Sequence, residues 1–383
     1  MTKMPQANLA TALNRCIASP EQAFCLPPAA YRDAETQALE ADRIFAGGWI
    51  PLGRADRVKA PGDYEALELA GRPLILLRDA QRQLRAHANT CRHRGALLVQ
   101  GCGNTKGIRC PFHAWLYKLD GSLAAAPRMA AAEGFDRSDY GLISYHTEER
   151  HGFAFVSFEA DPPSLDDWLG DFGELHAPWP LETLVTTRRW TREFDCDWKA
   201  FIDVFNEYYH LPYVHRDSID SVYADPDPAE AVTGHYTTQF GATMGTGGLL
   251  EGQQEHALPP MPGLTGRNAQ GVRYTWMFPS LTFAAGNEAM WAYEAYPVAP
   301  GRCRVTQSTC FPPETIVLPE FEAKAAQYYH RLDTALDEDI PALENQQRGL
   351  ASPDARQGRF SPELEPNVAA FARWYAGRML DGA

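Results

Sequence analysis

Hydrophobic and polar positions follow two different periods along this chain, and each change of period marks a change of structure. Between residues 34 and 45 apolar positions recur at helical spacing, which predicts an amphipathic helix. Two segments within residues 64–78 instead alternate as strands do and lie beside Pro-Gly and Gly-Arg-Pro turns. We therefore expect a helical lead over residues 1–46 and a small antiparallel β domain over residues 47–175.

A second set of alternating segments is followed by a long helical pattern. Four short segments within residues 273–311 alternate and are joined by turns, as in an antiparallel meander. After Pro319, apolar side chains recur at helical spacing over residues 321–336. We expect residues 176–383 to form a separate domain of α+β type, with the boundary in a Pro-rich link.

Composition and charge exclude several classes of protein. A chain of 383 residues with 45% hydrophobic and 22% charged residues is an ordinary globular protein with room for two domains. Its formal net charge of −14 argues against nucleic acid and anionic membranes as partners, and would suit a basic redox partner. The sequence has neither a signal-peptide core in its first twenty residues nor a membrane-spanning apolar run. We expect a cytoplasmic protein.

Polar side chains on an apolar helical face mark the first candidate metal site. In a single helix from Asp203 to His215, Glu207 and His210 fall on the same face as Asp203. His215 lies about 140° further round that helix than His210, and Pro212 supplies a bend that lets both imidazoles share a ligand. Two histidines beside carboxylates suit non-haem Fe(II) oxygen chemistry. A helix with satisfied core histidines is the alternative.

A third ligand is expected on the C-terminal helix. Asp339 lies seven residues past Leu332 and therefore on the buried stripe, whereas Asp337 lies off it. A buried aspartate is more often a structural hydrogen-bond acceptor than a ligand when it is considered alone. Asp339 is therefore a candidate for the third ligand, and the choice between these two roles rests on the resemblance described below.

Cysteines and histidines in the β domain form a second candidate site. A Cys-x-His motif at Cys91 and His93 precedes a Cys-x-x-His motif at Cys110 and His113 by sixteen intervening residues. Two thiolates and two imidazoles can close a zinc site, or hold a 2Fe–2S cluster with Cys on one iron and His on the other. The asymmetric first motif and the downstream metal site favour iron. The nearby His87 is more often a structural histidine than a ligand.

The segment over residues 91–121 resembles the Rieske domain of Rieske non-haem iron oxygenases. It reads Cys-Arg-His-Arg-Gly and later Cys-Pro-Phe-His-Ala-Trp-Leu-Tyr-Lys-Leu-Asp-Gly, with Ala114 where the family usually has glycine. The resemblance implies that one iron is bound by the thiolates and the other by the imidazoles. The implied ligands are Cys91 and Cys110, then His93 and His113.

The resemblance continues into the predicted metal helix. The family pattern of Asn-Trp-Lys, an acid and two histidines is matched by Asp197, Trp198, Lys199, Glu207, His210 and His215, with Asp197 in place of Asn. By resemblance, Glu207 links a Rieske histidine of a neighbouring subunit to an iron ligand, and its length leaves open whether it bridges or turns to the iron. We take Glu207 and Asp203 as candidate catalytic residues. The segment around Asp339 resembles the family's C-terminal ligand motif.

The resemblance implies an all-β Rieske domain followed by a helix-grip (START-like) domain, in which an antiparallel sheet under a long C-terminal helix encloses an apolar cavity. It implies a terminal oxygenase that uses a 2Fe–2S cluster, a mononuclear Fe(II) and O2. It also implies a cyclic homotrimer with each cluster beside the next subunit's iron. Because no dinucleotide-binding fingerprint is visible, NAD(P)H must act through a separate flavin and iron–sulfur reductase, with or without a ferredoxin.

Aromatic residues of the second domain are expected to contact the small-molecule substrate. The candidates for its pocket are Tyr208, Tyr209, Trp276, Phe278, Trp291 and Tyr293. Such rings can cage a quaternary ammonium, at about 0.5–2 kcal/mol per cation–π contact, or stack on a flat ring. Glu207, where most family members have Asp, resembles the acid of carnitine-type oxygenases, and together with the rather short chain this resemblance implies mono-oxygenation or N-demethylation of a betaine- or carnitine-like molecule. Aromatic ring hydroxylation or dioxygenation is the alternative, and a Rieske electron carrier or a ligand-binding module without catalysis is a remoter one.

Overall fold

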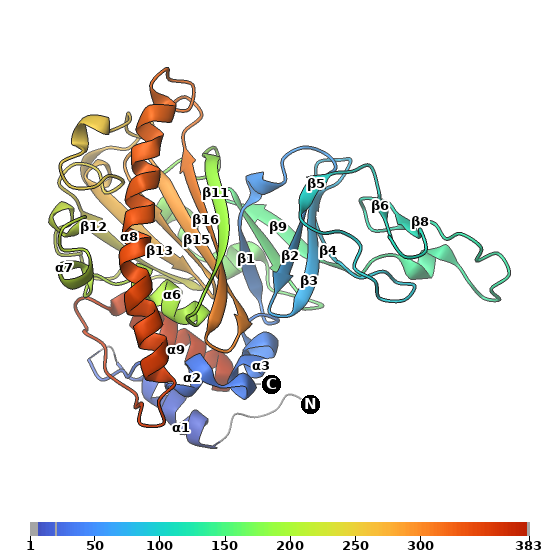
Figure 1. The fold of residues 1–383 in the computed structure, drawn as a ribbon, viewed down its shortest axis with the longest axis horizontal. Helices are drawn as coiled ribbons and strands as arrows, with labels where there is room; N and C mark the ends of the chain where they lie inside the picture. The colour runs from blue at the N-terminus through green and yellow to red at the C-terminus, as the bar shows by residue number, and fades with distance from the viewer. Residues whose placement is uncertain (1–6, 20, 381–383) are drawn as a thin grey trace. The chain divides into compact units, whose positions relative to one another are not determined.

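The computed structural model describes residues 7–19 and 21–380 (Figure 1). The chain divides into two compact units. The first, the β unit, is Gly47–Pro162, and the second, the catalytic unit, combines Met1–Ala46 with Pro163–Ala383. None of the described helices has both the length and the apolar character that a membrane span requires.

The β unit is built from two antiparallel sheets. Seven strands pair in the order β1-β10-β9-β4-β3-β2-β5, and a smaller sheet has the order β6-β7-β8. The strands are β1 (Trp49–Arg54), β2 (Asp63–Leu69), β3 (Arg72–Arg78), β4 (Leu84–Ala88), β5 (Cys102–Asn104), β6 (Ile108–Arg109), β7 (Leu116–Tyr117), β8 (Leu123–Ala125), β9 (Ser144–Arg150) and β10 (Phe153–Ser157). Short 3-10 helices span Ala55–Arg57 and Arg137–Tyr140. The predicted all-β domain is confirmed.

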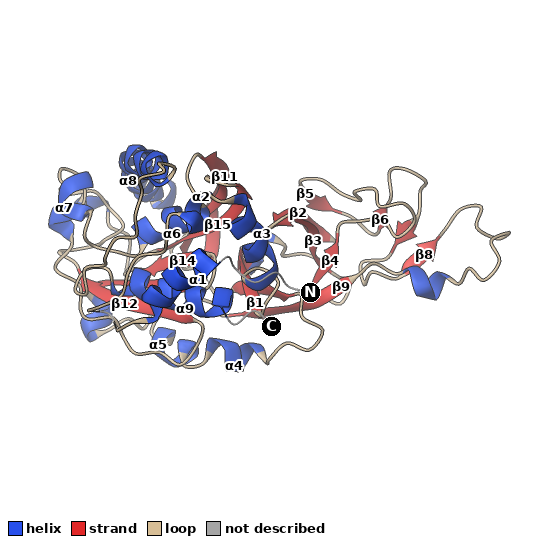
Figure 2. Ribbon diagram, turned by 90° about the horizontal axis from the view of Figure 1, so that it is seen from below, coloured by secondary structure: helices blue, strands red, loops and turns tan. Residues whose placement is uncertain are grey.

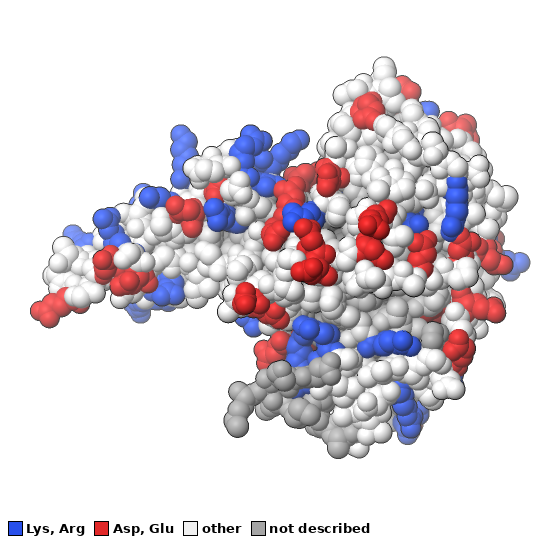
Figure 3. Space-filling view, turned by 180° about the vertical axis from the view of Figure 1, so that it is seen from behind, with Lys and Arg blue, Asp and Glu red and all other residues white. Residues whose placement is uncertain are grey.

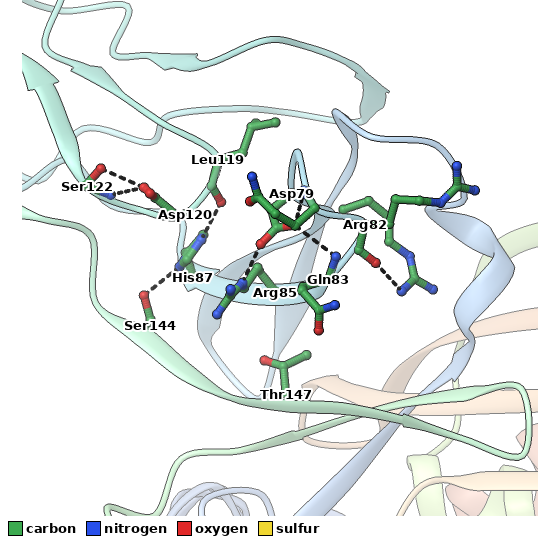
Figure 4. A network of polar contacts seen from close by, with 12 residues as sticks. Asp79, Arg82, Gln83, Arg85, His87, Leu119, Asp120, Ser122, Ser144 and Thr147 are labelled. Atoms are coloured by element: carbon green, nitrogen blue, oxygen red, sulfur yellow. Dashed lines mark hydrogen bonds and ion pairs between the residues drawn. The ribbon is translucent and has the colours of Figure 1, made fainter.

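His87 is a structural residue of this unit. It lies on β4 with no exposed surface, and its Nε2 is 3.1 Å from the carbonyl oxygen of Leu119. Its Nδ1 is 2.8 Å from the hydroxyl of Ser144 on β9 (Figure 4). Both ring nitrogens therefore bind protein atoms, and the contact fixes the segment that follows the second Cys-His motif.

The catalytic unit is a six-stranded antiparallel sheet covered by helices on both faces. The strands, in the order β11-β16-β15-β14-β13-β12, are β11 (Val185–Phe194), β12 (Tyr236–Ala242), β13 (Gly271–Met277), β14 (Leu281–Ala285), β15 (Met290–Ala299) and β16 (Arg302–Phe311). Figure 2 shows α8 (Phe321–Leu350) on one side of this sheet, and α4 (Leu165–Leu169) and α5 (Phe172–His176) on the other. A long helix against an antiparallel sheet confirms the helix-grip prediction.

The remaining helices of this unit surround the same core. They are α1 (Ala7–Asn14), α2 (Ala29–Arg32), α3 (Ala34–Arg43), α6 (Trp198–Phe205), α7 (Leu211–Val214) and α9 (Pro366–Leu380), with 3-10 helices at Arg15–Ile17, Asp220–Val222, Gln254–His256 and Gly266–Ala269. The predicted apolar stripe of α8 is buried, as its residues Phe321, Ala325 and Tyr328 show. Acidic and basic side chains are both spread over the face seen in Figure 3.

The boundaries of the units differ from those expected from the sequence. The β unit ends at Pro162 rather than at residue 175, because Ser164 caps α4 and the buried side chains of α4 belong to the catalytic unit. Trp168 of α4 stacks on His235, with ring centroids 3.6 Å apart. Residues 1–46 are likewise part of the catalytic unit and not a separate lead.

A buried carboxyl group between β14 and β15 makes the stability of this unit sensitive to pH. Glu288 is 7% exposed, and burial raises its pKa from 4.5 to about 7 despite a hydrogen bond with Thr246. Because the folded-state pKa is the higher one, the contribution of Glu288 to stability is greatest below pH 4.5 and is lost as pH rises through 7. We expect Glu288→Gln to stabilise the protein by about 1–3 kcal/mol at high pH.

The measurement is urea unfolding of both proteins at pH 5 and at pH 8.5. The stabilisation should appear at the higher pH and shrink at the lower one. Glu322→Gln, at an exposed glutamate on α8, is the matched control and should change little at either pH. An equal effect of Glu288→Gln at both pH values would show that packing and not ionisation is responsible.

Candidate metal centres and substrate pocket

Two loops of the β unit bring together the four predicted ligands of the first centre. Cys91 and Cys110 are 3% and 2% exposed, and the rings of His93 and His113 meet edge to face with centroids 4.7 Å apart. The loops are held by backbone hydrogen bonds to each cysteine carbonyl, from Gly95 at 2.9 Å and from Ala114 at 3.1 Å. The hydroxyl of Tyr117 lies 3.3 Å from the Cys91 sulfur.

The donors of this centre fit a 2Fe–2S cluster. Nδ1 of His93 is buried and has no hydrogen-bond partner, although its ring is fixed by stacking on Trp115 at 4.9 Å. A buried nitrogen without a partner is costly unless something binds it. Two thiols and two imidazoles match the donor set of a Rieske cluster.

Ala114 explains why glycine suits its position in the second loop. Its φ is 59°, in the left-handed region that favours residues without a Cβ. The alanine therefore costs about 1 kcal/mol relative to glycine. Its amide still donates to Cys110, so the loop geometry is kept.

The second centre lies in the catalytic unit, where His210, His215 and Asp339 converge. One ligand atom from each lies within 4.8 Å of the others. Nε2 of His215 is 3.1 Å from Oδ1 of Asp339, and Nε2 of His210 is 3.7 Å from the same oxygen. That oxygen is buried without a hydrogen-bond partner, so these residues fit a single metal ion with two imidazoles and one carboxylate.

The prediction of one bent helix through these histidines is wrong. Helix α6 ends at Phe205, and α7 begins only at Leu211. The side chain of Asn206 ends α6 by donating to the Ile202 carbonyl at 2.8 Å and accepting from Thr282 of β14 at 3.1 Å. Pro212 lies in the first turn of α7, where it needs no N–H donor, and bends nothing.

Two glutamates orient the histidines by contacting their Nδ1 atoms, on the side of each ring away from the converging Nε2 atoms. Oε1 of Glu207 makes a short contact with Nδ1 of His210, and Oε2 accepts from the amide of His210 at 3.1 Å. Oε2 of Glu338 lies 2.7 Å from Nδ1 of His215 and accepts from Ser218 at 2.7 Å. Each carboxylate fixes the tautomer that leaves Nε2 free for a metal. This role of Glu338 was not predicted from the sequence.

The electrostatics of the second centre favour a cation. Burial lowers the pKa of His210, but the hydrogen bond and charge of Glu207 and the charge of Asp339 raise it by more, so the pKa lies above 6.5. Glu207 contacts the outer nitrogen of His210 and so does not occupy a ligand position.

Asp203 lies outside the pocket that contains the three ligands. One oxygen of Asp203 accepts from the hydroxyl of Tyr31 at 3.1 Å, and burial raises the pKa of Asp203 well above its ordinary range. Its predicted alignment with Glu207 fails because the helix ends between them.

A pocket adjoins the metal ligands, and aromatic and aliphatic side chains make up most of its walls. The lining is Phe201, Val204, Phe205, Glu207, Tyr208, His210, Leu211, His215, Ile219, Tyr274, Tyr293, Arg331, Ala335, Leu336, Asp339 and Leu343. Its cavity is small, about 60 Å³. Of the six predicted pocket residues, Tyr208 and Tyr293 line it.

The other four predicted aromatics lie elsewhere. Trp276 and Phe278 pack against Phe371 of α9, with centroids 3.9 Å and 5.5 Å away. Tyr209 is 49% exposed, and Trp291 lies beside the pocket with Arg331 over its ring at 5.2 Å. Phe201, Phe205, Tyr274 and Arg331 were missed, although Arg331 precedes Asp339 by two helical turns and could have been found by that spacing.

A Cys2His2 centre in an all-β unit and a His2Asp centre in a helix-grip unit define a Rieske-type oxygenase, an oxidoreductase that uses O2. The chain belongs to the family of ring-hydroxylating alpha subunits, whose catalytic-domain model matches residues 181–381. The model of the Rieske [2Fe-2S] domain matches residues 48–143. The family's cofactors are the Rieske cluster and a mononuclear iron, with electrons from NAD(P)H through a reductase.

Its relatives include oxygenase subunits of known systems. The chain is 29% identical to the carnitine monooxygenase oxygenase subunit of Acinetobacter pittii, covering 91% of both chains. It is 25% identical to the glycine betaine monooxygenase oxygenase subunit of Pseudomonas aeruginosa, covering 95% of this chain and 91% of that protein. The crystal structure of the quaternary ammonium Rieske monooxygenase CntA with L-carnitine is 26% identical, with a TM-score of 0.80 over 96% of this chain and 98% of that one.

Proposed function

We propose that this chain mono-oxygenates a small quaternary ammonium compound of the betaine or carnitine type. The observation that carries the proposal is the aromatic wall beside the metal ligands. Phe205 meets Tyr293 and Tyr274 with ring centroids 5.0 Å and 5.4 Å away. Ring faces stabilise a cation that cannot donate hydrogen bonds, by about 0.5–2 kcal/mol per contact.

The reaction would insert one oxygen atom of O2 into a C–H bond beside the quaternary nitrogen. The other oxygen atom leaves as water, with two electrons supplied through the reductase and two protons. The hydroxylated product then splits its C–N bond to give an aldehyde and a tertiary amine, and releases a proton. Substrates without a nitrogen at that carbon would keep the hydroxyl group.

The chain's own residues would serve this reaction by binding and orientation. Cys91, His93, Cys110 and His113 would hold the cluster, and His210, His215 and Asp339 would hold the iron, which supplies the activation of O2. Glu207 and Glu338 keep the imidazoles of the second centre turned toward the metal. The aromatic side chains of the pocket would pack against the bound substrate and so shield the reacting carbon from water.

Aromatic hydroxylation is the second candidate. Naphthalene 1,2-dioxygenase from Rhodococcus has the same fold, with a TM-score of 0.77 at 21% identity.

The partners follow from the same proposal. A reductase supplies electrons, and we propose a head-to-tail trimer in which Glu207 bridges His113 of a neighbouring subunit and His210, so that electrons would cross between the two centres along this hydrogen-bonded path. The short contact between Glu207 and His210 supports the second half of that route. The cytoplasmic location stays a prediction.

The test is a single-turnover assay that needs no reductase. Chemically reduced protein is mixed with O2 and with betaines, carnitine or aromatic acids, and the products are read by mass spectrometry. An aldehyde with a tertiary amine is the expected result. A phenol or cis-diol would move the protein to the aromatic hydroxylases.

A further inference from the structure

One buried cation in the pocket wall is left without an acidic partner. Arg331 of α8 is 4% exposed and lines the pocket together with the metal ligands. Its Nη2 donates to the hydroxyl of Tyr223 at 3.0 Å, and its guanidinium lies over Trp291 at 5.2 Å. Its Nε is buried without a hydrogen-bond partner. Within residues 7–19 and 21–380, no carboxylate oxygen lies within 4.0 Å of its nitrogens.

The groups around Arg331 are neutral and already occupied. The Tyr223 hydroxyl donates to the Gly247 carbonyl at 3.0 Å and accepts from Tyr274 at 2.8 Å, in addition to Arg331. A guanidinium has five N–H donors, and it remains charged when buried. A buried charge without a counter-ion is unfavourable, so this site favours an anion that enters the pocket.

We propose that Arg331 binds a carboxylate group of the substrate. A carboxylate matches the planar fork of a guanidinium, which can give it two parallel N–H bonds. The inference rests on the proposed function and deepens it, because it assigns the anionic end of a zwitterion to Arg331. A quaternary ammonium alcohol, which has no anionic end, would leave Arg331 unpaired and bind weakly.

The position of Arg331 also orients the substrate. Arg331, Ala335 and Asp339 recur every four residues along one face of α8, and all three line the pocket. The first and the last are about 12 Å apart along the helix axis. A substrate held at Arg331 therefore presents its opposite, cationic end to the metal ligands. The oxidised carbon lies at the end remote from the carboxylate.

The experiment compares Arg331→Gln with the wild-type holoenzyme by isothermal titration calorimetry. The holoenzyme is kept oxidised and no reductant is added, so that it binds ligand without turnover. The probes are 4-(trimethylammonio)butanoate, its alcohol analogue 4-(trimethylammonio)butanol, and benzoate. We expect Arg331→Gln to lower the affinity for the two carboxylates by about 10- to 100-fold. The affinity for the alcohol should stay the same or rise. Arg331→Lys should show an intermediate loss, because it keeps the charge and loses the fork.

Arg188→Gln is the matched control. Arg188 is a partly buried arginine that pairs with Asp333 of α8 outside the pocket lining. Iron content and thermal unfolding of all variants are compared first. The assignment is overturned if Arg331→Gln lowers the affinity for all three probes equally. It is also overturned if Arg331→Gln lowers the affinity for the carboxylates by no more than Arg188→Gln does.

The same experiment separates this inference from the proposed function. In one outcome, the protein binds and oxidises an aromatic acid in a manner that depends on Arg331, and it does not oxidise either quaternary ammonium. That outcome would refute the proposed substrate and retain the carboxylate site. In the other outcome, both quaternary ammonium compounds are oxidised, and their half-saturating concentrations are the same in the wild type and in Arg331→Gln. That outcome would retain the proposed function and refute the carboxylate site.

Discussion

Asp339→Ala is expected to remove the mononuclear iron and nearly all activity while the Rieske cluster stays intact. Asp339 supplies the only carboxylate oxygen among the three converging ligand atoms of the described residues. Two imidazoles alone bind Fe(II) weakly, so the loss should exceed the roughly 10- to 100-fold that removal of a supporting hydrogen bond costs. Iron analysis should fall from about three atoms per chain to about two, with the visible spectrum of the cluster unchanged.

Asp337→Ala is the control for this change. Asp337 lies on the same helix two residues away, but its side chain is exposed. The variant should keep its iron content and its single-turnover product yield. If Asp339→Ala retained three irons per chain, the third ligand would have to be sought elsewhere, and Glu338 would be the next residue to test.

Lys199→Met is expected to destabilise the catalytic unit by about 3–5 kcal/mol. Lys199 has no exposed surface and pairs with Glu40 at 2.7 Å and with Asp197 at 2.8 Å. Glu40 also accepts from Trp198 at 3.1 Å and from Tyr375 at 2.5 Å, so one network joins α3, α6 and α9. Burial lowers the pKa of Lys199, but the two carboxylates raise it by more, so the amine stays charged. Its removal leaves two carboxylates buried without a cation.

Urea unfolding measures this loss, and Arg302→Ala is the control. Arg302 pairs with Glu193 at 2.7 Å, but its side chain is 51% exposed. An exposed pair contributes about 0–1 kcal/mol, so the control should unfold close to wild type. Equal effects of the two substitutions would show that the buried network adds no more stability than a surface ion pair.

The sequence predicted which side chains come together better than it predicted the backbone that carries them. Spacing, residue type and the family resemblance together grouped His210, His215 and Asp339, and the structure places one ligand atom of each within 4.8 Å of the others. The helix through the histidines was wrong, because Asn206 and Glu207 bind backbone groups and end α6 before His210. Side chains such as these compete locally with the helix for its backbone hydrogen-bonding groups. The outcome here also depends on Thr282, which is far away in the sequence and donates to Asn206.

The pocket aromatics were harder to predict for a physical reason. Trp276 and Tyr274 lie on the same strand and the same face, yet only Tyr274 reaches the pocket. Alternation assigns a face of the sheet, and the helix that covers each part of that face decides what a residue touches. Phe371 of α9 stacks on Trp276, and no local pattern places α9 there. Arg331 was missed because charged residues are expected outside the core.

The split of the catalytic unit into two stretches of chain has a consequence for synthesis on the ribosome. Arg32 donates to the carbonyls of Leu350 and Ser352, which are 318 and 320 residues further along the chain. At roughly 5–20 residues per second, α2 and α3 therefore wait about 15–60 s for these partners. The β unit, Gly47–Pro162, is continuous and can fold during that interval. Nascent chains of this enzyme would thus fold the β unit, which carries the predicted cluster ligands, before the catalytic unit. The N-terminal helices would stay exposed to chaperones until the last helix emerges.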